Sequence, residues 1–236
     1  MSRTATIYAQ HAPAYAQLVA HEDYEGRLLP AIWRLHPLQG ANVVEFGAGT
    51  GRLTRLLVPH AAAIYAHDGS PHMLATARQQ LADVPSCTFV AADHRAMPLP
   101  ARCADLVLEG WAFAQLAAWH LPDWRAVLVP AMREMLRVLR PGGTAILIET
   151  LGTGALEPAP PADWFEAVYA WFEGEYGFTR SWIRTDFRFA TRQEAEAGIR
   201  FFFGDEQAAA IMAAAWTARD GATIVPECTG IWSRRV

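Results

Sequence analysis

The sequence predicts an α/β fold in which helices flank a doubly wound, mostly parallel sheet. Two observations predict it: five apolar runs of strand length alternate with helical patterns, and a carboxylate residue follows or ends each run. Near-continuous apolar runs are typical of parallel strands buried on both faces, and strand–helix alternation produces such sheets. Ligands bind beyond the carboxyl ends of these strands. The acids at those ends are Glu45, Asp68, Asp93, Glu109 and Glu149.

The first strand, loop and helix form the most informative segment. Residues 43–54 read Val-Val-Glu-Phe-Gly-Ala-Gly-Thr-Gly-Arg-Leu-Thr, with Gly47, Gly49 and Gly51 at alternate positions before a helical pattern of leucines. Glycines allow positive φ and a close approach of a ligand to the main chain, and amides at a helix N-terminus point at that ligand. The dinucleotide fingerprint would require a third glycine at position 52, where this chain has Arg52.

The remaining elements follow from apolar patterning and turn residues. The core continues with a strand at 61–67, a helix beginning at Ser70-Pro71, strands at 87–91 and 104–108, a helix around 132–139 that stops at Pro141-Gly142-Gly143, and a strand at 144–148. Beyond it we expect a loop at 151–165, a helix at 164–172, a strand at 182–189, a helical stretch around Ile199 and a last strand at 227–234. Residues 1–40 are helical in pattern.

Composition indicates one large globular domain. The chain has 236 residues, 52% of them hydrophobic and 19% charged, with a net charge of −4. A nucleic-acid-binding protein would normally carry a basic excess, so DNA and tRNA are disfavoured as partners. The scattered cysteines, Cys87, Cys103 and Cys228, argue against a zinc site or disulfide framework. We see no signal peptide and no membrane span, and expect a cytoplasmic protein without a membrane partner.

Residues 41–150 resemble the class I S-adenosylmethionine (SAM) dependent methyltransferases of bacteria. The run Glu45-Phe46-Gly47-Ala48-Gly49-Thr50-Gly51 is similar to their first motif, Asp68 to the ribose-binding acid, Ala92-Asp93-His94 to the adenine-binding position, and Arg140-Pro141-Gly142-Gly143 to the turn before the fifth strand. The resemblance implies a Rossmann-like sheet of seven strands, mostly parallel with an antiparallel last strand. It also implies SAM as the cofactor and S-adenosylhomocysteine as its product.

The same resemblance assigns the cofactor site. The residues expected to bind SAM are Tyr15, Glu45, Gly47, Ala48, Gly49, Thr50, Asp68, Gly69, Met73, Ala92, Asp93, His94, Glu109 and Gly110. Asp68 can accept hydrogen bonds from both ribose hydroxyls, or serve only as a helix cap. The N-terminal segment with Tyr8 and Tyr15 resembles a lid over the cofactor. Tyr8, His11 and Trp111 are expected to line the acceptor pocket, where an aromatic wall also suits a sulfonium cation.

Methyl transfer from a sulfonium chiefly requires that donor and acceptor be held in line, away from water. A metal is not required, and a general base helps only when the acceptor is a hydroxyl or a protonated amine. Glu149 and His120 are the candidates for that base; their structural alternatives are a loop-capping acid and a helix-end residue. Arg180, Arg184 and Arg188 fall on one face of the predicted strand, where they bind an acidic acceptor or, as we favour, form a solvated edge.

We therefore expect a single domain over residues 1–236, with an N-terminal helical lid (1–40), a SAM-binding core (41–150) and a C-terminal extension on the substrate side (151–236). The expected function is methyl transfer to an O, N or C nucleophile of a small molecule, by a monomer or homodimer. One alternative is a SAM-binding protein with a non-methylating or regulatory role. An NAD(P)-dependent oxidoreductase is a weaker alternative, because Arg52 and Asp93 count against it.

Overall fold

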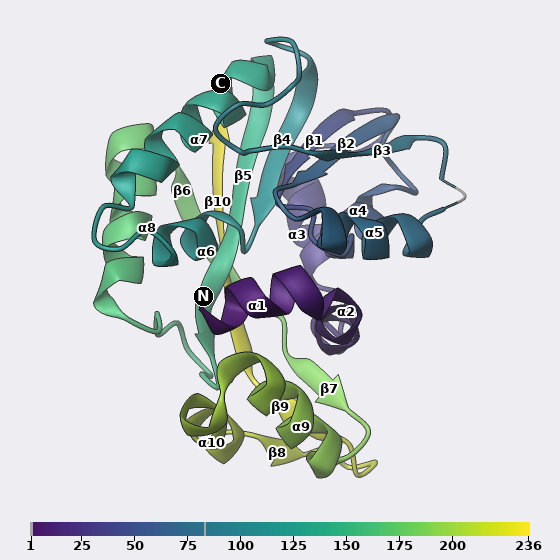
Figure 1. Cartoon of the computed structure of the whole chain (residues 1–236), viewed down its shortest axis with the longest axis vertical. Coiled ribbons are helices and arrows are strands. Elements are labelled where there is room, and N and C mark those ends of the chain that lie inside the picture. The colour runs from purple at the N-terminus through teal and green to yellow at the C-terminus, as the bar shows by residue number, and fades with distance from the viewer. Residues whose placement is uncertain (1, 83) are drawn as a thin grey trace.

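Seven strands form the central sheet of the computed structural model, which describes residues 2–82 and 84–236. Across the sheet their order is β3 (Cys87–Ala91), β2 (Ala63–Asp68), β1 (Asn42–Phe46), β4 (Ala104–Gly110), β5 (Leu139–Thr153), β10 (Glu227–Arg235) and β6 (Thr179–Arg184). The pairs from β3 to β5 are parallel, whereas β10 is antiparallel to both of its neighbours. The predicted seven-stranded sheet with an antiparallel last strand is therefore confirmed (Figure 1).

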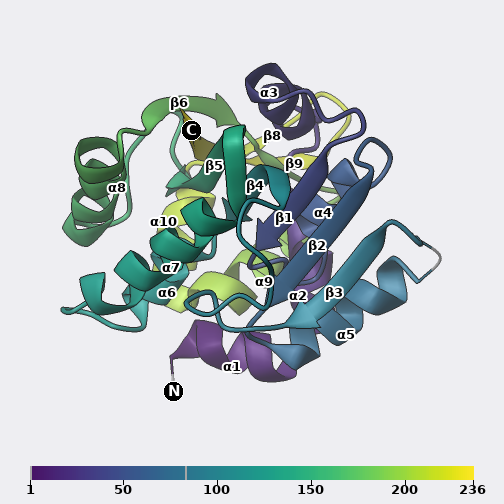
Figure 2. The ribbon, with the colours of Figure 1, turned by 90° about the horizontal axis from the view of Figure 1, so that it is seen from above.

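Helices cover both faces of this sheet. The described helices are α1 (Arg3–Gln10), α2 (Ala12–Val19), α3 (Leu28–Leu35), α4 (Arg52–Leu57), α5 (Pro71–Gln80), α6 (Phe113–Ala118), α7 (Arg125–Val138), α8 (Asp163–Tyr176), α9 (Arg192–Phe203) and α10 (Asp205–Ala213). Helices α6, α7 and α8 pack on one face, and α3, α4 and α5 pack on the other (Figure 2).

Strand β5 shows why its sequence is apolar at consecutive positions. Successive side chains of a strand point to opposite faces. Ala145 and Leu147 pack into the core beneath α7, whereas Ile146 and Ile148 pack into the core on the α3 side. All four are fully buried. Because both faces of the sheet are covered, a ligand reaches the strands only at their ends.

A second, smaller sheet was not predicted. It consists of β7 (Phe187–Phe189), β9 (Thr223–Val225) and β8 (Trp216–Thr217), in that order. The single strand predicted at 182–189 is divided between the two sheets, because the chain turns at Asp186. The carboxylate of Asp186 accepts the backbone N–H of Glu227 at 3.0 Å and pairs with Arg184 at 2.8 Å. Figure 1 shows this sheet with α9 and α10 below the central sheet, and α1 and α2 between them.

The divided strand corrects the prediction for the three arginines. They do not share one strand face, because Arg188 belongs to β7 and the other two to β6. Each arginine is paired with a carboxylate: Arg180 with Glu173, Arg184 with Asp186 and Arg188 with Asp220. An acidic acceptor would need these guanidinium groups, but each is already paired with a carboxylate of the protein.

Two predicted boundaries have different outcomes. The helix start at Ser70-Pro71 is confirmed, since the Ser70 hydroxyl accepts the N–H of Met73 at 3.3 Å and Pro71 is the first residue of α5. The stop at Pro141-Gly142-Gly143 is displaced, because α7 already ends at Val138 and these residues lie inside β5. Strand β5 also continues to Thr153, so the loop predicted from residue 151 begins later.

Three further observations concern the whole described chain. Within residues 2–82 and 84–236, no helix has both the length and the apolar character needed to cross a bilayer. In the same residues, no group of three or more His, Cys, Asp or Glu side chains is placed to hold a metal ion. Cys87, Cys103 and Cys228 are free thiols.

Candidate active site

The glycine-rich loop between β1 and α4 is held in place by the end of β2. Gly47, Gly49 and Gly51 all have positive φ, at +75°, +54° and +87°. The N–H of Gly47 donates to the backbone carbonyl of His67 at 2.8 Å, and the N–H of Gly49 donates to Asp68 Oδ2 at 2.9 Å. The loop therefore lies over the carboxyl ends of both strands with its main chain exposed to a ligand, as predicted.

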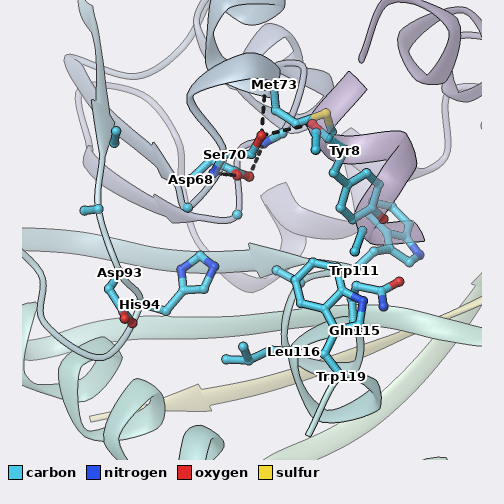
Figure 3. Close-up of a pocket in the computed structure, with 18 of the residues that line it drawn as sticks. Tyr8, Asp68, Ser70, Met73, Asp93, His94, Trp111, Gln115, Leu116 and Trp119 are labelled. Atoms are coloured by element: carbon cyan, nitrogen blue, oxygen red, sulfur yellow. Dashed lines mark hydrogen bonds between the residues drawn. The ribbon is translucent and has the colours of Figure 1, made fainter. Parts of the chain in front are cut away.

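A cavity of about 910 Å³ opens over this loop, and we call it the loop cavity. Its lining includes Ala5, Tyr8, Ala9, Tyr15, Gly47, Gly49, Asp68, Gly69, Ser70, Pro71, His72, Met73, Ala91, Ala92, Asp93, His94, Arg95, Gly110, Trp111, Ala112, Gln115, Leu116, Trp119 and His120. Figure 3 shows Asp68 and His94 on one side of the cavity and Tyr8, Trp111 and Trp119 on the other. The volume is in the range of small-molecule and cofactor sites.

Most of the predicted cofactor residues line this cavity. They are Tyr15, Gly47, Gly49, Asp68, Gly69, Met73, Ala92, Asp93, His94 and Gly110. Four others are not in its lining: Glu45, Ala48, Thr50 and Glu109. The two glutamates are buried beside it and bind other groups of the protein. Glu45 accepts the Thr54 hydroxyl at 2.6 Å, and Glu109 accepts the N–H groups of Ala112 and Phe113 at 3.0 and 3.1 Å.

Asp68 and His94 supply the polar groups deep in the loop cavity. Each oxygen of Asp68 accepts one backbone amide, from Gly49 at 2.9 Å and from Ser70 at 2.7 Å, which leaves further lone pairs for a ligand. Burial lowers the pKa of His94, so its ring is neutral. Its Nδ1 is buried and has no hydrogen-bond partner among the described residues. Unpaired buried polar atoms are costly, so this nitrogen is suited to a ligand donor or acceptor.

Asp93 lies at the rim and is already paired. Both of its oxygens accept hydrogen bonds from the Arg95 guanidinium, at 2.6 to 3.1 Å. The bond from Arg95 lowers the pKa of Asp93 to about 2, so the carboxylate is ionised. About half of the side chain is exposed, which leaves one side open to the cavity.

The N-terminal helices α1 and α2 pack against the loop cavity. The carbonyl of Tyr8 accepts the Ser70 hydroxyl at 3.0 Å, and the N–H of Ala12 donates to His72 Nε2 at 3.3 Å. The rings of Tyr8 and Tyr15 meet edge to face, with centroids 5.2 Å apart. Burial raises the pKa of Tyr15 to about 12, so its phenol stays neutral. Helices α1 and α2 are therefore docked on α5, and their role as a lid stays a prediction.

A second cavity of about 530 Å³ adjoins the first, and we call it the aromatic cavity. Its lining includes Thr4, Tyr8, Tyr15, Leu18, Val19, Glu22, Arg52, Trp111, Ala114, Gln115, Ala118, Glu149, Thr150, Thr153, Pro161, Trp164, Phe165, Phe187, Phe202, Phe203, Gln207, Ala210, Ile211 and Glu227. Four residues line both cavities: Tyr8, Tyr15, Trp111 and Gln115. The two cavities therefore share a wall that these side chains form.

Trp111 is held at the junction in a strained conformation. Its φ is +55°, which is uncommon for a bulky residue, and its N–H donates to the carbonyl of Ile148 at 2.7 Å. The Arg52 guanidinium lies 3.7 Å from the centre of the Trp111 ring and pairs with Glu22 at 2.7 Å. Arg52, which replaces the glycine of the dinucleotide fingerprint, thus forms part of the wall.

The structure separates the remaining predicted site residues. Tyr8 and Trp111 lie at the junction, but His11 is exposed between α1 and α2 and is in the lining of neither cavity. His120 is at the edge of the loop cavity, with Nδ1 2.9 Å from the carbonyl of Leu116. Glu149 lines the aromatic cavity, and burial together with Glu109 raises its pKa well above the usual range. The raised pKa favours the protonated form of Glu149, which cannot act as a base. The roles of Glu149 and His120 as bases both stay predictions.

Sequence reasoning missed Glu22, Arg52 as a wall residue, and Glu227. Glu227 had a detectable signal, because it is the first residue of an antiparallel last strand. Such a strand begins at the edge where the parallel strands end, so its first side chain lies at the ligand edge. Glu22 follows α2 in an irregular connection, where no periodic pattern indicates a direction.

The buried Glu45 predicts a specific pH dependence of stability. Burial raises its pKa from 4.5 to about 7. Between these values the unfolded chain loses a proton that the folded protein keeps, so stability present at pH 4.5 is lost as the pH rises to about 7. We expect Glu45 to account for a loss of about 3 kcal/mol in the free energy of unfolding over this interval.

Urea denaturation of the wild type and of Glu45→Gln at both ends of this interval checks the prediction. The variant should lose less stability than the wild type by that amount, because glutamine does not titrate. Glu196→Gln, on the exposed side of α9, is the matched control and should follow the wild type. Identical pH dependence in all three proteins would contradict the assignment.

Comparison with known proteins identifies the type of domain. Residues 44–147 match the family model described as "Methyltransferase domain". A malonyl-[acyl-carrier protein] O-methyltransferase from Serratia marcescens is 30% identical over 153 residues, which are 65% of this chain and 54% of that protein. The chain thus spans about half the length of the curated relatives that it matches first.

Solved structures agree on the fold. A SAM-dependent methyltransferase from Aquifex aeolicus matches with a TM-score of 0.55 and 14% identity, over 91% of this chain and 95% of that one. The [4+2]-cyclase SpnF matches with a TM-score of 0.61 and 19% identity, over 98% of this chain and 95% of that one. At these identities the likeness concerns the fold, and it is the fold that the sequence predicts.

Proposed function

We propose that the protein transfers the methyl group of SAM to a small-molecule acceptor, a proposal that the match of residues 44–147 to the methyltransferase-domain model supports. The observation that carries the proposal is the meeting of two cavities at Tyr8, Tyr15, Trp111 and Gln115. Methyl transfer requires the donor methyl and the acceptor atom to lie in line, and two adjoining cavities can hold the two reactants in that way. A cavity of about 530 Å³ suits a small molecule.

The residues of the loop cavity fit the proposed cofactor. Gly49 leaves the main chain bare, and the free lone pairs of Asp68 can accept the ribose hydroxyls. His94 and Asp93 are the residues that would contact the adenine ring; His94 has an unpaired ring nitrogen and Asp93 an ionised carboxylate. The chemistry that SAM supplies when bound is a methyl group on a positively charged sulfur, which needs no further activation.

The chain's own contribution is orientation and the exclusion of water. The rings of Tyr8, Tyr15 and Trp111 line both cavities, and neutral aromatic faces attract a cation such as a sulfonium. Helices α1 and α2, which carry Tyr8 and Tyr15, are held at the loop cavity by hydrogen bonds to Ser70 and His72 and would limit the access of water. We assign no general base to the reaction, since burial and the neighbouring Glu109 raise the pKa of Glu149 well above its usual range and His120 is not in the lining of the aromatic cavity.

Methyl-labelled SAM tests the proposal. The protein is incubated with labelled SAM and, in parallel, with the low-molecular-weight metabolites, the proteins and the nucleic acids of a bacterial extract. We expect label to enter the metabolite fraction. Label confined to protein or nucleic acid would overturn the small-molecule acceptor, and SAM binding without label in any fraction would overturn methyl transfer.

A further inference from the structure

Most of the ionisable side chains that line the aromatic cavity are acidic. Among the described residues of its lining, three are glutamates, Glu22, Glu149 and Glu227, and Arg52 is the one basic residue. The Arg52 guanidinium lies 2.7 Å from Glu22 and 3.7 Å from the centre of the Trp111 ring, so a carboxylate of the protein already offsets its charge. One buried guanidinium nitrogen of Arg52 has no hydrogen-bond partner of good geometry among the described residues. The cavity therefore offers carboxyl groups and one cation that is already ion-paired.

Glu227 is the carboxyl group with an unused oxygen. The side chain is 2% exposed, and its Oε1 accepts the Thr150 hydroxyl at 2.8 Å. That hydroxyl in turn accepts the N–H of Gly152 at 3.1 Å, so the carboxyl group is held in one orientation. Its Oε2 is buried and has no hydrogen-bond partner in the described chain. When the carboxyl group is ionised, a ligand that donates a hydrogen bond would satisfy this oxygen, whereas an anion would be repelled.

Most of the remaining lining residues are apolar or aromatic. Trp164, Phe165, Phe187, Phe202 and Phe203 are among them, together with a few uncharged polar side chains such as Gln115 and Gln207. Such rings bind flat apolar surfaces by offset stacking and edge contacts. An apolar cavity with a few convergent polar groups is the usual form of a small-molecule site, in which the polar groups select the ligand.

We propose that the aromatic cavity binds a planar, apolar acceptor that donates a hydrogen bond from a hydroxyl or amine group to Glu227, and that it rejects carboxylate acceptors. This inference rests on the proposed function, in which the acceptor occupies this cavity. It distinguishes the chain from its relative in Serratia marcescens, whose name specifies a malonyl group as substrate. A malonyl carboxylate in this cavity would meet the carboxyl groups of Glu149 and Glu227, and the one cation of the described lining, Arg52, is already ion-paired with Glu22.

Burial and the nearby Glu22 raise the pKa of Glu227 to about 8. The carboxyl groups and cation that face it are Glu22, from the segment after α2, and Arg52, from α4. Because Oε1 accepts the Thr150 hydroxyl, a proton on Glu227 would be carried by Oε2, which would then donate. Above about pH 8 the carboxyl group is mainly ionised, and Oε2 accepts from a hydroxyl or amine. We therefore expect the selectivity for hydrogen-bond donors above about pH 8, and the binding experiments are done there.

A matched set of ligands tests the proposal by calorimetry in the presence of saturating S-adenosylhomocysteine. The probes are 2-naphthol, 2-naphthylamine, 2-methoxynaphthalene and 2-naphthoate, which share one planar body and differ in the polar group. We expect 2-naphthol, 2-naphthylamine or both to bind about tenfold or more tightly than 2-methoxynaphthalene, and 2-naphthoate to bind most weakly. Binding of 2-naphthoate as tight as that of both donors would overturn the inference.

The variant Glu227→Gln links this selectivity to one side chain. It should weaken the tighter donor probe about tenfold and leave the affinity for S-adenosylhomocysteine unchanged, which also reports that the fold is intact. Glu196→Gln is the matched control and should change neither value. If a Glu227→Gln protein binds S-adenosylhomocysteine and its affinity for the donor probe is unchanged, the inference is overturned, whereas the proposed function is not. Failure of the wild type to bind S-adenosylhomocysteine would overturn the proposed function and the inference together.

Discussion

Replacing Gly47 with alanine is expected to lower the free energy of unfolding by about 2–5 kcal/mol, against about 1–2 kcal/mol for Gly49→Ala. Both glycines have positive φ, so both replacements carry the cost of a left-handed alanine. They differ in what a new Cβ would contact. At Gly47 it would lie 2.3 Å from the Cβ of Ala112, whereas at Gly49 the nearest atom is the flexible tip of Met73, at 3.4 Å.

Ala112 cannot easily move away. It lies in the turn between β4 and α6, and its N–H donates to the buried carboxyl group of Glu109 at 3.0 Å. Urea denaturation of both variants measures the difference, and Gly49→Ala is the matched control because it keeps the same loop and the same sign of φ. Equal losses of stability would show that the close approach of the loop to this turn does not constrain Gly47.

The second large effect concerns the affinity for SAM. We expect Asp68→Ala to weaken SAM binding by about 1–3 kcal/mol, or roughly 5- to 150-fold, because a charged acceptor of hydrogen bonds is lost. Calorimetry measures this, with Asp123→Ala, in the exposed connection before α7, as the control. Because Asp68 also binds the amides of Gly49 and Ser70, the variant is expected to be less stable as well.

Stability and affinity together separate the two roles of Asp68. A variant that is less stable but binds SAM as tightly as the wild type would show that Asp68 only anchors the loop. A loss of affinity in a folded variant, with Asp123→Ala unchanged, would support a direct contact with the ligand.

The strand-end rule predicted the loop cavity well, and its failures have a physical pattern. It located Asp68 and Asp93 correctly, since parallel strands end at one edge of the sheet. It did not reveal that Glu45 and Glu109 accept hydrogen bonds from other groups of the protein. Glu45 accepts from the Thr54 hydroxyl, and Glu109 accepts from the amides at the start of α6. A sequence shows which residues stand at the edge, but the direction of a carboxyl group depends on partners that only the packing supplies.

The aromatic cavity was largely beyond sequence reasoning, because its wall is assembled from distant segments. Arg52 follows the glycine loop, Glu22 follows α2, and Glu227 begins the last strand. The division of residues 182–189 between two sheets depends on Asp186, whose carboxylate binds the main chain of β10. A pattern of period two predicts a strand there, but it does not indicate a change of sheet.

The central claim is that the loop cavity binds SAM, and calorimetry with SAM, S-adenosylhomocysteine and NAD tests it most directly. The account predicts saturable binding of SAM and S-adenosylhomocysteine by the wild-type protein, and no comparable binding of NAD. Tight binding of NAD with no binding of SAM would contradict it.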